Sequence, residues 1–313
     1  MGAHGMPVAL RATCLATLAG LLAGCELEEI TLVQAEDVVI AEVYVQLDGG
    51  GGGDTTVRAF LHRTLGLEGS RPVPGAAVTV TRQSGATLEL AEAGQALCIE
   101  SIPIEGDGTC YWASPEPGRV DPGETLRLDI VLPDGGVLTS ATTVPGSFEP
   151  VGIPSDGPCR IAPDTTMELR WSRAEGAWAY VNETLLSGIG PALAMEGIEA
   201  EDPLYLLGLS VSAVDTTIVF PSEFGVFNRF ELDQDLALRL QRGLPDGVVG
   251  DVTVTATDRN YVNWVRGGSF NPSGQVRLPS VRGDGTGVFA AVVVQRLQIV
   301  SSADPQAAPA CPS

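Results

Sequence analysis

The chain has 313 residues, enough for two domains of ordinary size, and its 44% apolar content argues against global disorder. Its formal net charge of −21 disfavours binding to phosphate backbones, so no nucleic-acid partner is expected. The 38 glycines and 22 prolines indicate many tight turns between short strands rather than long helices.

The first 24 residues have the organisation of a bacterial lipoprotein signal. Arg11 is the only charge before an apolar run, 12–24, which is too short to span a bilayer because a helical span needs ~20 apolar residues. The run ends in Leu22-Ala23-Gly24-Cys25. We expect cleavage before Cys25 and a diacylglycerol on its sulfur. The alternative is an ordinary secretory signal with an incidental cysteine.

The expected mature chain begins at Cys25 and has a net charge of −22, because the removed segment carries one positive charge, Arg11. So acidic a chain is repelled by anionic lipid, which makes a covalent lipid the expected route to a membrane. Residues 25–36 are interpreted as an acidic tether that starts with Glu26, Glu28 and Glu29. An acidic stretch directly after the lipidated cysteine resembles the surface-export tether of Bacteroidetes lipoproteins, which implies a lipid-anchored protein of the outer membrane that faces the periplasm or the cell surface.

Four further cysteines predict disulfides, because an even number in an exported protein is typically bridged. They are Cys98, Cys110, Cys159 and Cys311, and they allow three pairings. We favour Cys98–Cys110, which closes a short loop, and Cys159–Cys311, which ties down the C-terminal end. Metal ligation is the alternative. It is disfavoured because no C-x-x-C occurs and the only mature histidine is His62.

Residues 37–146 predict a β-sandwich, because short alternating or β-branched segments recur between turn signals. Asp134-Gly135-Gly136 is typical of a hairpin turn. The first two segments are expected to form another hairpin. The predicted strands are 38–47, 56–63, 76–81, 87–90, 126–132 and 137–144.

A Pro-, Gly- and Ser-rich stretch without periodicity predicts a linker over 147–163, followed by a second β-rich domain over 164–300 and a tail over 301–313. Residues 228–240 are ambiguous, because their apolar positions alternate as in a strand while the second half also suits a helix. Short helices or loops are expected at 189–198 and 260–265. Strands are predicted at 167–171, 177–181, 204–214, 216–220, 251–257 and 288–300.

Several landmarks follow one another in a fixed order: an acidic stretch after the cleavage box, a first strand, 71–80, 123–136, 142–146 and 279–289. In that order the sequence resembles the domain-of-unknown-function family 4249, exported lipoproteins best represented in Bacteroidetes and relatives. The resemblance implies an envelope lipoprotein with an N-terminal immunoglobulin-like sandwich, like the regulatory β domains beside outer-membrane receptors. It implies no activity, and it transfers no functional residue.

No catalytic residue is predicted. A Ser-His-Asp or Cys-His site needs a histidine, and His62 stands alone on a predicted strand, where a surface position is the simpler interpretation. No G-x-S-x-G elbow occurs. A protein that is not an enzyme is therefore favoured.

Two sets of residues are candidates for ligand binding. If their segment is a strand, Glu231, Asp233 and Asp235 share one face and could bind Ca²⁺ or act as glycosidase acids. The alternative is that these acids form the solvent-exposed face of a strand whose apolar residues are buried on the other face. Tyr261 and Trp264 could form a sugar-stacking platform, against the alternative of core packing. Apart from Ca²⁺, no cofactor is expected.

The expected function is non-catalytic binding: a membrane-anchored lipoprotein that serves as an accessory to an outer-membrane receptor or transporter. The rival expectation is a glycan-binding or glycan-cleaving surface lipoprotein that uses the three carboxylates and the Trp264 region.

Overall fold

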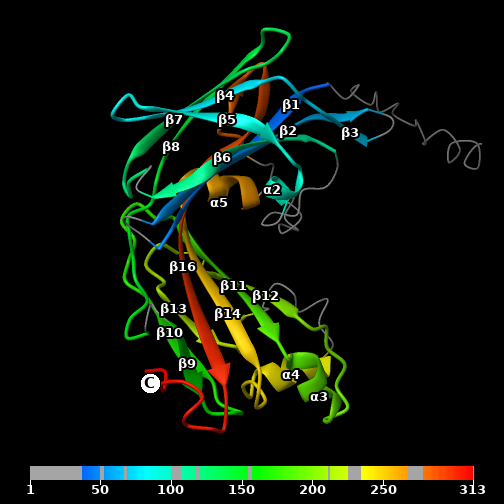
Figure 1. Ribbon diagram of the computed structural model, residues 1–313, viewed down its shortest axis with the longest axis vertical. Coiled ribbons are helices and arrows are strands. Elements are labelled where there is room, and N and C mark those ends of the chain that lie inside the picture. The colour runs from blue at the N-terminus through cyan, green and yellow to red at the C-terminus, as the bar shows by residue number, and fades with distance from the viewer. Residues whose placement is uncertain are drawn as a thin grey trace, which may run out of the picture. The chain divides into compact units, whose positions relative to one another are not determined.

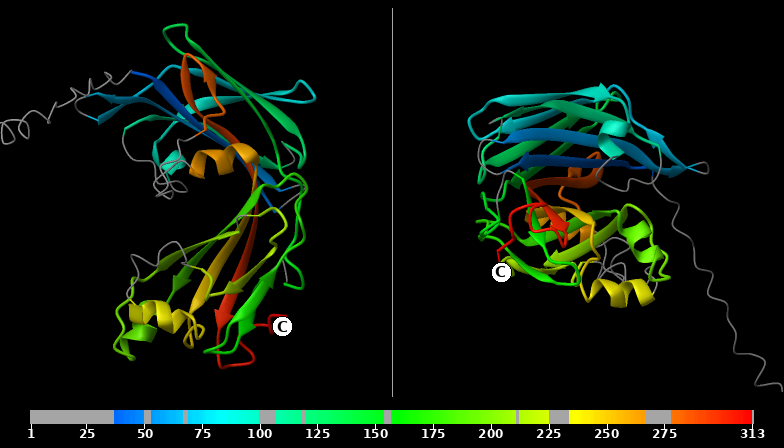
Figure 2. Two further views of the ribbon diagram at one scale, coloured as in Figure 1. Left: turned by 180° about the vertical axis from the view of Figure 1, so that it is seen from behind. Right: turned by 60° about the horizontal axis from the view of Figure 1, so that its bottom comes forward.

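The computed structural model describes nine stretches of the chain, which belong to one compact unit, Asp37–Ser313 (Figures 1 and 2). The expected signal peptide, Cys25 and the acidic tether lie outside the described residues. The described stretches are 37–49, 53–66, 69–99, 107–117, 120–153, 157–210, 212–224, 234–266 and 278–312.

The first sandwich consists of two layers that share β5 (Thr87–Ala93), which pairs with one strand of each layer. One layer has the order β16-β1-β2-β6, and the other has the order β4-β7-β8-β15. The short strand β3 pairs with β2, and α2 (Ala96–Ile99) follows β5. The bounds are β1 Val39–Asp48, β2 Asp54–Gly66, β3 Gly69–Pro72, β4 Ala77–Arg82, β6 Thr109–Pro117, β7 Thr125–Val131, β8 Val137–Thr143, β15 Arg282–Gly283 and β16 Gly285–Ser301.

Alternating side chains place the core of this sandwich. In β7, Leu126, Leu128 and Ile130 are fully buried while the residues between them face outward. Both predicted hairpins are confirmed: β1 pairs antiparallel with β2, and the turn at Asp134-Gly135-Gly136 joins β7 to β8.

Strand β16 is 17 residues long and runs through both sandwiches (Figure 1). Residues 285–294 pair in parallel with β1, and residues 292–300 pair antiparallel with β14 (Val249–Thr257). The apolar run that predicted this strand is buried on both faces. Phe289 and Ala291 face the sandwich core, whereas Val288 and Ala290 lie against α5 (Arg259–Arg266).

The second sandwich has one layer in the order β12-β11-β14-β16, with β9 paired to the other edge of β16, and a facing pair, β10 and β13. Ile218 and Phe220 of β13 lie directly over Gly208 and Gly250 of the larger layer. The bounds are β9 Pro158–Ile161, β10 Met167–Arg170, β11 Ala179–Ser187, β12 Leu204–Ser210, β13 Thr217–Phe220, α3 Ile189–Ala194 and α4 Gln234–Leu240.

The predicted fold class is confirmed: the protein is mainly β, with an immunoglobulin-like sandwich followed by a second β-rich part. The structure places a strand in the predicted linker and resolves the end of the ambiguous segment. The predicted linker contains β9, because its Pro158–Ile161 segment pairs with β16. The end of the ambiguous segment is a helix, because Leu236 and Leu240 are four residues apart and share a buried face. The predicted domain limits stay a prediction, although β15 and half of β16 complete the first sandwich from the C-terminal end of the chain.

Both favoured disulfides are present. Cys98–Cys110 links α2 to β6, and Cys159–Cys311 links β9 to the C-terminal segment. The Cys311 N–H donates to the Arg160 carbonyl at 2.8 Å, and the Arg160 N–H donates to the Pro309 carbonyl at 2.7 Å. The C-terminal segment is therefore fixed along β9 by backbone hydrogen bonds as well as by the disulfide.

Candidate functional site

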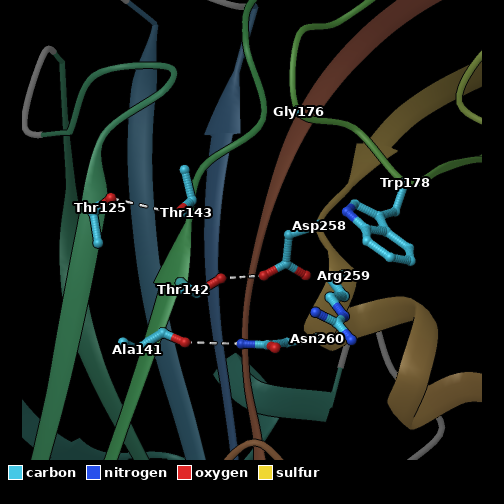
Figure 3. A pocket seen from close by; sticks show the side chains of 9 residues that line it. All are labelled: Thr125, Ala141, Thr142, Thr143, Gly176, Trp178, Asp258, Arg259 and Asn260. Carbon is cyan, nitrogen blue, oxygen red and sulfur yellow. Dashed lines mark hydrogen bonds between the residues drawn. The ribbon is translucent and has the colours of Figure 1, made fainter.

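A pocket of about 290 Å³ lies where the first sandwich meets the turn before β11 and the start of α5 (Figure 3). Thr125 of β7 and residues 141–143 of β8 form one wall. Gly176, Trp178 and residues 258–260 form the opposite wall. The pocket therefore combines segments that are far apart in the sequence.

Asp258 connects the two walls of the pocket. Its carboxylate accepts the Thr142 hydroxyl of β8 and the Tyr261 N–H of α5, the latter at 2.8 Å, so it serves as the N-cap of the helix. Its own N–H donates to the Ala291 carbonyl of β16 at 3.2 Å. Asp258 is 3% exposed, and burial raises its pKa to about 6 although the hydrogen bonds oppose that shift.

Asn260 is a second support of the same kind. Its side-chain amide donates to the Ala141 carbonyl at 2.9 Å and to the Phe289 carbonyl at 2.8 Å. Because Asp258 and Asn260 both bind neighbouring strands, these two side chains fix α5 to the sandwich rather than project into the pocket as reacting groups.

Trp178 is the most exposed aromatic residue at the pocket, with 45% of its surface accessible. The backbone N–H of Trp178 donates to the Thr257 carbonyl at 2.8 Å. In the preceding turn, the Gly146 N–H donates to the Glu175 carbonyl at 2.7 Å. The Arg259 guanidinium carbon lies 5.0 Å from the indole centroid, a cation–π contact. The indole is thus presented on a fixed backbone.

The groups that face the pocket can stack a ring and form hydrogen bonds. Arg259 is exposed, and its guanidinium makes no ion pair with a described residue. Thr125 and Thr143 lie with their hydroxyl oxygens 3.3 Å apart on the opposite wall. An indole, a guanidinium and two hydroxyls together suit a small polar ligand with an apolar face.

At Tyr261 and Trp264 the structure has core packing instead of the candidate platform. Both residues lie on α5, where Trp264 is 8% exposed and packs with Tyr44, Val288 and Ala290. The Tyr261 ring lies 6.2 Å from the Tyr44 ring in an edge-on arrangement. These aromatic side chains cover the outer face of β1 and β16, so the alternative of core packing holds.

The three carboxylates are not brought onto one strand face. Asp235 is exposed in the first turn of α4, which is a helix rather than a strand. Glu231 and Asp233 lie outside the described residues. Across the described stretches, no group of three or more His, Cys, Asp or Glu is arranged to hold a metal ion. Ca²⁺ binding stays a prediction for Glu231 and Asp233.

His62 lies on β2, as expected, and is half-buried, 5.7 Å from the ring of Phe60. Burial lowers the pKa of its imidazole. In the part of the chain that the structure describes, no helix is both long and apolar enough to cross a membrane.

A second hollow, of about 470 Å³, is lined by Asp164, Glu196, Arg239 and Arg242. Its central residue, Arg239, already has hydrogen-bond partners within the protein. The Arg239 side chain is 5% exposed and donates to Glu196 at 2.8 Å, to Asp164 at 2.5 Å and to the Gly243 carbonyl at 2.9 Å. This cluster fixes α4 to the segment that follows α3, and we interpret it as structural.

Sequence reasoning missed Asp258, and it considered Trp178 only as one of four tryptophans, Trp112, Trp171, Trp178 and Trp264, that could include a sugar-stacking platform. A signal for Asp258 exists, since an Asp directly before 259–266 is a good N-cap for a helix. Trp178 has no such signal, because Ala177, Ala179 and Tyr180 around it are all buried and follow no simple period.

Protonation of Asp258 predicts a pH dependence of stability. The folded-state pKa of about 6 lies above the ordinary 3.8, so the folded state binds more protons between these values and loses stability as pH rises through them. Asp258→Asn keeps an oxygen for the Tyr261 N–H and does not titrate. Between about pH 4 and pH 7 its free energy of unfolding should therefore gain roughly 2–3 kcal/mol relative to wild type. Urea denaturation of both proteins across this range measures the gain, and parallel pH profiles would contradict it.

No family model matches the chain, and no curated protein matches it. Among solved structures, Dpr11 IG1 bound to DIP-gamma IG+IG2 is 10% identical, with a TM-score of 0.20 and coverage of 86% of this chain and 100% of that one. The fibronectin(III)-like modules of Clostridium thermocellum CbhA are 10% identical, with a TM-score of 0.22 and coverage of 84% and 94%. A DUF4785 family protein from Legionella pneumophila is 12% identical, with a TM-score of 0.20, and 68% of this chain covers 51% of it. Likenesses of this size assign neither a family nor a function.

Proposed function

We propose that this protein is a lipid-anchored, non-catalytic binding protein of the outer membrane, and that the pocket between β8, Trp178 and α5 is its ligand site. The proposed anchor is Cys25, supported by the apolar run and the Leu22-Ala23-Gly24-Cys25 box. The resemblance to the domain-of-unknown-function family 4249 supports the same compartment. Its partner would be an outer-membrane receptor or transporter.

The observation that supports a binding role is that some pocket side chains fix its walls while others stay exposed to a ligand. Asp258 and Asn260 are held by β8, β16 and α5, so the walls are fixed. Trp178 and Arg259 remain exposed toward the ligand side. A preformed concave site with a few oriented polar groups is the arrangement that binding proteins use.

Capture from the native envelope tests this proposal. The lipidated wild type is compared with the pocket variant Trp178→Leu/Arg259→Gln and with a matched control, Tyr205→Leu/Arg282→Gln. Tyr205 is exposed to 44%, close to the 45% of Trp178, and Arg282 is an exposed arginine of β15. We expect an outer-membrane receptor or transporter to co-purify with wild type and control but not with the pocket variant.

Two results would count against it. A transporter that is retained by the pocket variant would place the partner's contact elsewhere. The anchor is tested separately by Cys25→Ser, which should move the protein from the membrane fraction to the soluble fraction and abolish labelling by radioactive palmitate. Wild-type protein without incorporated palmitate would overturn the proposed anchor.

A glycan ligand is the second candidate, and the exposed Trp178 indole favours it. The expected site at Trp264 is closed by packing, but Trp178 presents the same chemistry at the pocket.

A further inference from the structure

We infer that this pocket binds a neutral saccharide, with one pyranose ring against the Trp178 indole and its hydroxyls bonded to Arg259, Thr125 and Thr143. The inference rests on the proposed binding function and names the chemical class of its ligand.

Pocket size favours a single sugar ring. Its volume of about 290 Å³ is at the lower end of the range for small-molecule sites, ~300–1,000 Å³. A longer glycan would place its terminal ring here and leave the rest in solvent.

Stacking and hydrogen-bonding groups are arranged around the same space. A pyranose with equatorial hydroxyls has an apolar face of axial C–H groups that packs on an aromatic ring, and its hydroxyls point outward along the ring edge. Trp178 supplies the aromatic ring on a backbone fixed by the Thr257 carbonyl. Arg259 lies on the surface beside it, so its guanidinium can rotate from the indole and donate to hydroxyls.

The opposite wall completes the polar set. Thr125 and Thr143 carry hydroxyls 3.3 Å apart, and each can both donate and accept. Ala141 lines the same wall on β8, and its small side chain adds no bulk beside Thr143 (Figure 3). A sugar hydroxyl, which is also both donor and acceptor, matches such a pair better than a group that can only accept.

Charge decides between neutral and charged ligands. The mature chain carries a net charge of −22, which repels anions at long range. Asp258 is among the residues that line the pocket, so an acidic ligand would lie near its buried carboxylate. A cationic ligand would in turn face Arg259. A neutral sugar avoids both repulsions while it uses the same donors and acceptors.

The test uses the full-length lipidated protein in a detergent without sugar headgroups, such as a dimethylamine oxide. A printed array of neutral and acidic oligosaccharides identifies bound glycans, and isothermal titration with the best-bound oligosaccharide measures affinity. We expect neutral glycans to bind. Trp178→Leu should weaken binding about tenfold and Arg259→Gln about fivefold, whereas Tyr205→Leu should leave it unchanged.

Because Trp178 and Arg259 are exposed, near-ultraviolet circular dichroism should show these variants folded, and Thr143→Val offers a second pocket variant on the other wall. Preferential binding of acidic glycans, or no binding of any array member by folded wild type, would overturn the inference. Equal loss in Tyr205→Leu would overturn the location. Neither result changes the envelope capture and palmitate readouts, so failure of this inference is distinguishable from failure of the proposed function.

Discussion

Gly287→Ala is expected to destabilise the protein by about 4 kcal/mol, because it combines backbone strain with a steric clash. Gly287 has φ +136°, a conformation that residues with a Cβ rarely adopt. A Cβ there would lie 2.0 Å from the Ala41 carbonyl oxygen of β1. Since Ala41 is the register partner of Gly287, relief of the clash would separate β1 from β16.

The consequences reach both sandwiches, because β16 is the strand that they share. Separation at Gly287 would expose buried residues on both strands, among them Val39, Val43 and Phe289. Urea denaturation followed by tryptophan fluorescence measures the loss in free energy of unfolding.

Gly135→Ala is the matched control. Gly135 also has a positive φ, +89°, but a Cβ there meets no atom within 4 Å. Gly135→Ala should therefore lower the free energy of unfolding only by the cost of a positive φ in alanine, about 1–2 kcal/mol. Equal losses in the two variants would show that the close approach to Ala41 is not what requires glycine at position 287.

Local features of the fold were predictable because they depend on neighbours in the sequence. The alternation of Leu126, Leu128 and Ile130 encodes a half-buried strand without reference to the rest of the chain. The Asp134-Gly135-Gly136 turn fixes a hairpin for the same reason. The C-terminal disulfide was also within reach, since four cysteines allow only three pairings.

The role of β16 was not predictable from these signals. Its apolar run indicates burial on both faces, but nothing local says that 285–294 pair with β1 in one sandwich and 292–300 with β14 in the other. The pairings with β1 join residues more than 200 positions apart, such as Val43 and Phe289. They are set by the packing of the whole chain, and so is the inclusion of β9 in the sheet.

The pocket was not predictable from the sequence for a related reason. Composition around Tyr261 and Trp264 suggests a platform, but α5 turns these aromatic side chains onto β16 and buries them. Trp178 becomes important only because the turn before β11 reaches β8 and α5 in space. Whether an aromatic residue packs or is presented depends on these long-range contacts.

Removal of the Cys159–Cys311 disulfide is expected to lower the free energy of unfolding more than removal of Cys98–Cys110. The first spans 152 residues and the second spans 12. In the chain-entropy account a cross-link restricts the unfolded state more when its loop is longer, which gives about 5 kcal/mol for the first and about 3 kcal/mol for the second. The paired variants Cys159→Ala/Cys311→Ala and Cys98→Ala/Cys110→Ala measure the difference by urea denaturation.

Local packing makes this comparison informative. Cys98 and Cys110 are both buried against Phe60, so their replacement also removes core contacts. Cys159 is equally buried, and the segment it holds retains the Arg160 bonds to Pro309 and Cys311. If packing dominated, the short-loop pair would be the costlier one to lose. The predicted order therefore requires the entropy of the unfolded chain to outweigh the contacts around Phe60. Local exchange of the backbone amide at position 311 should rise only when the long-range pair is removed.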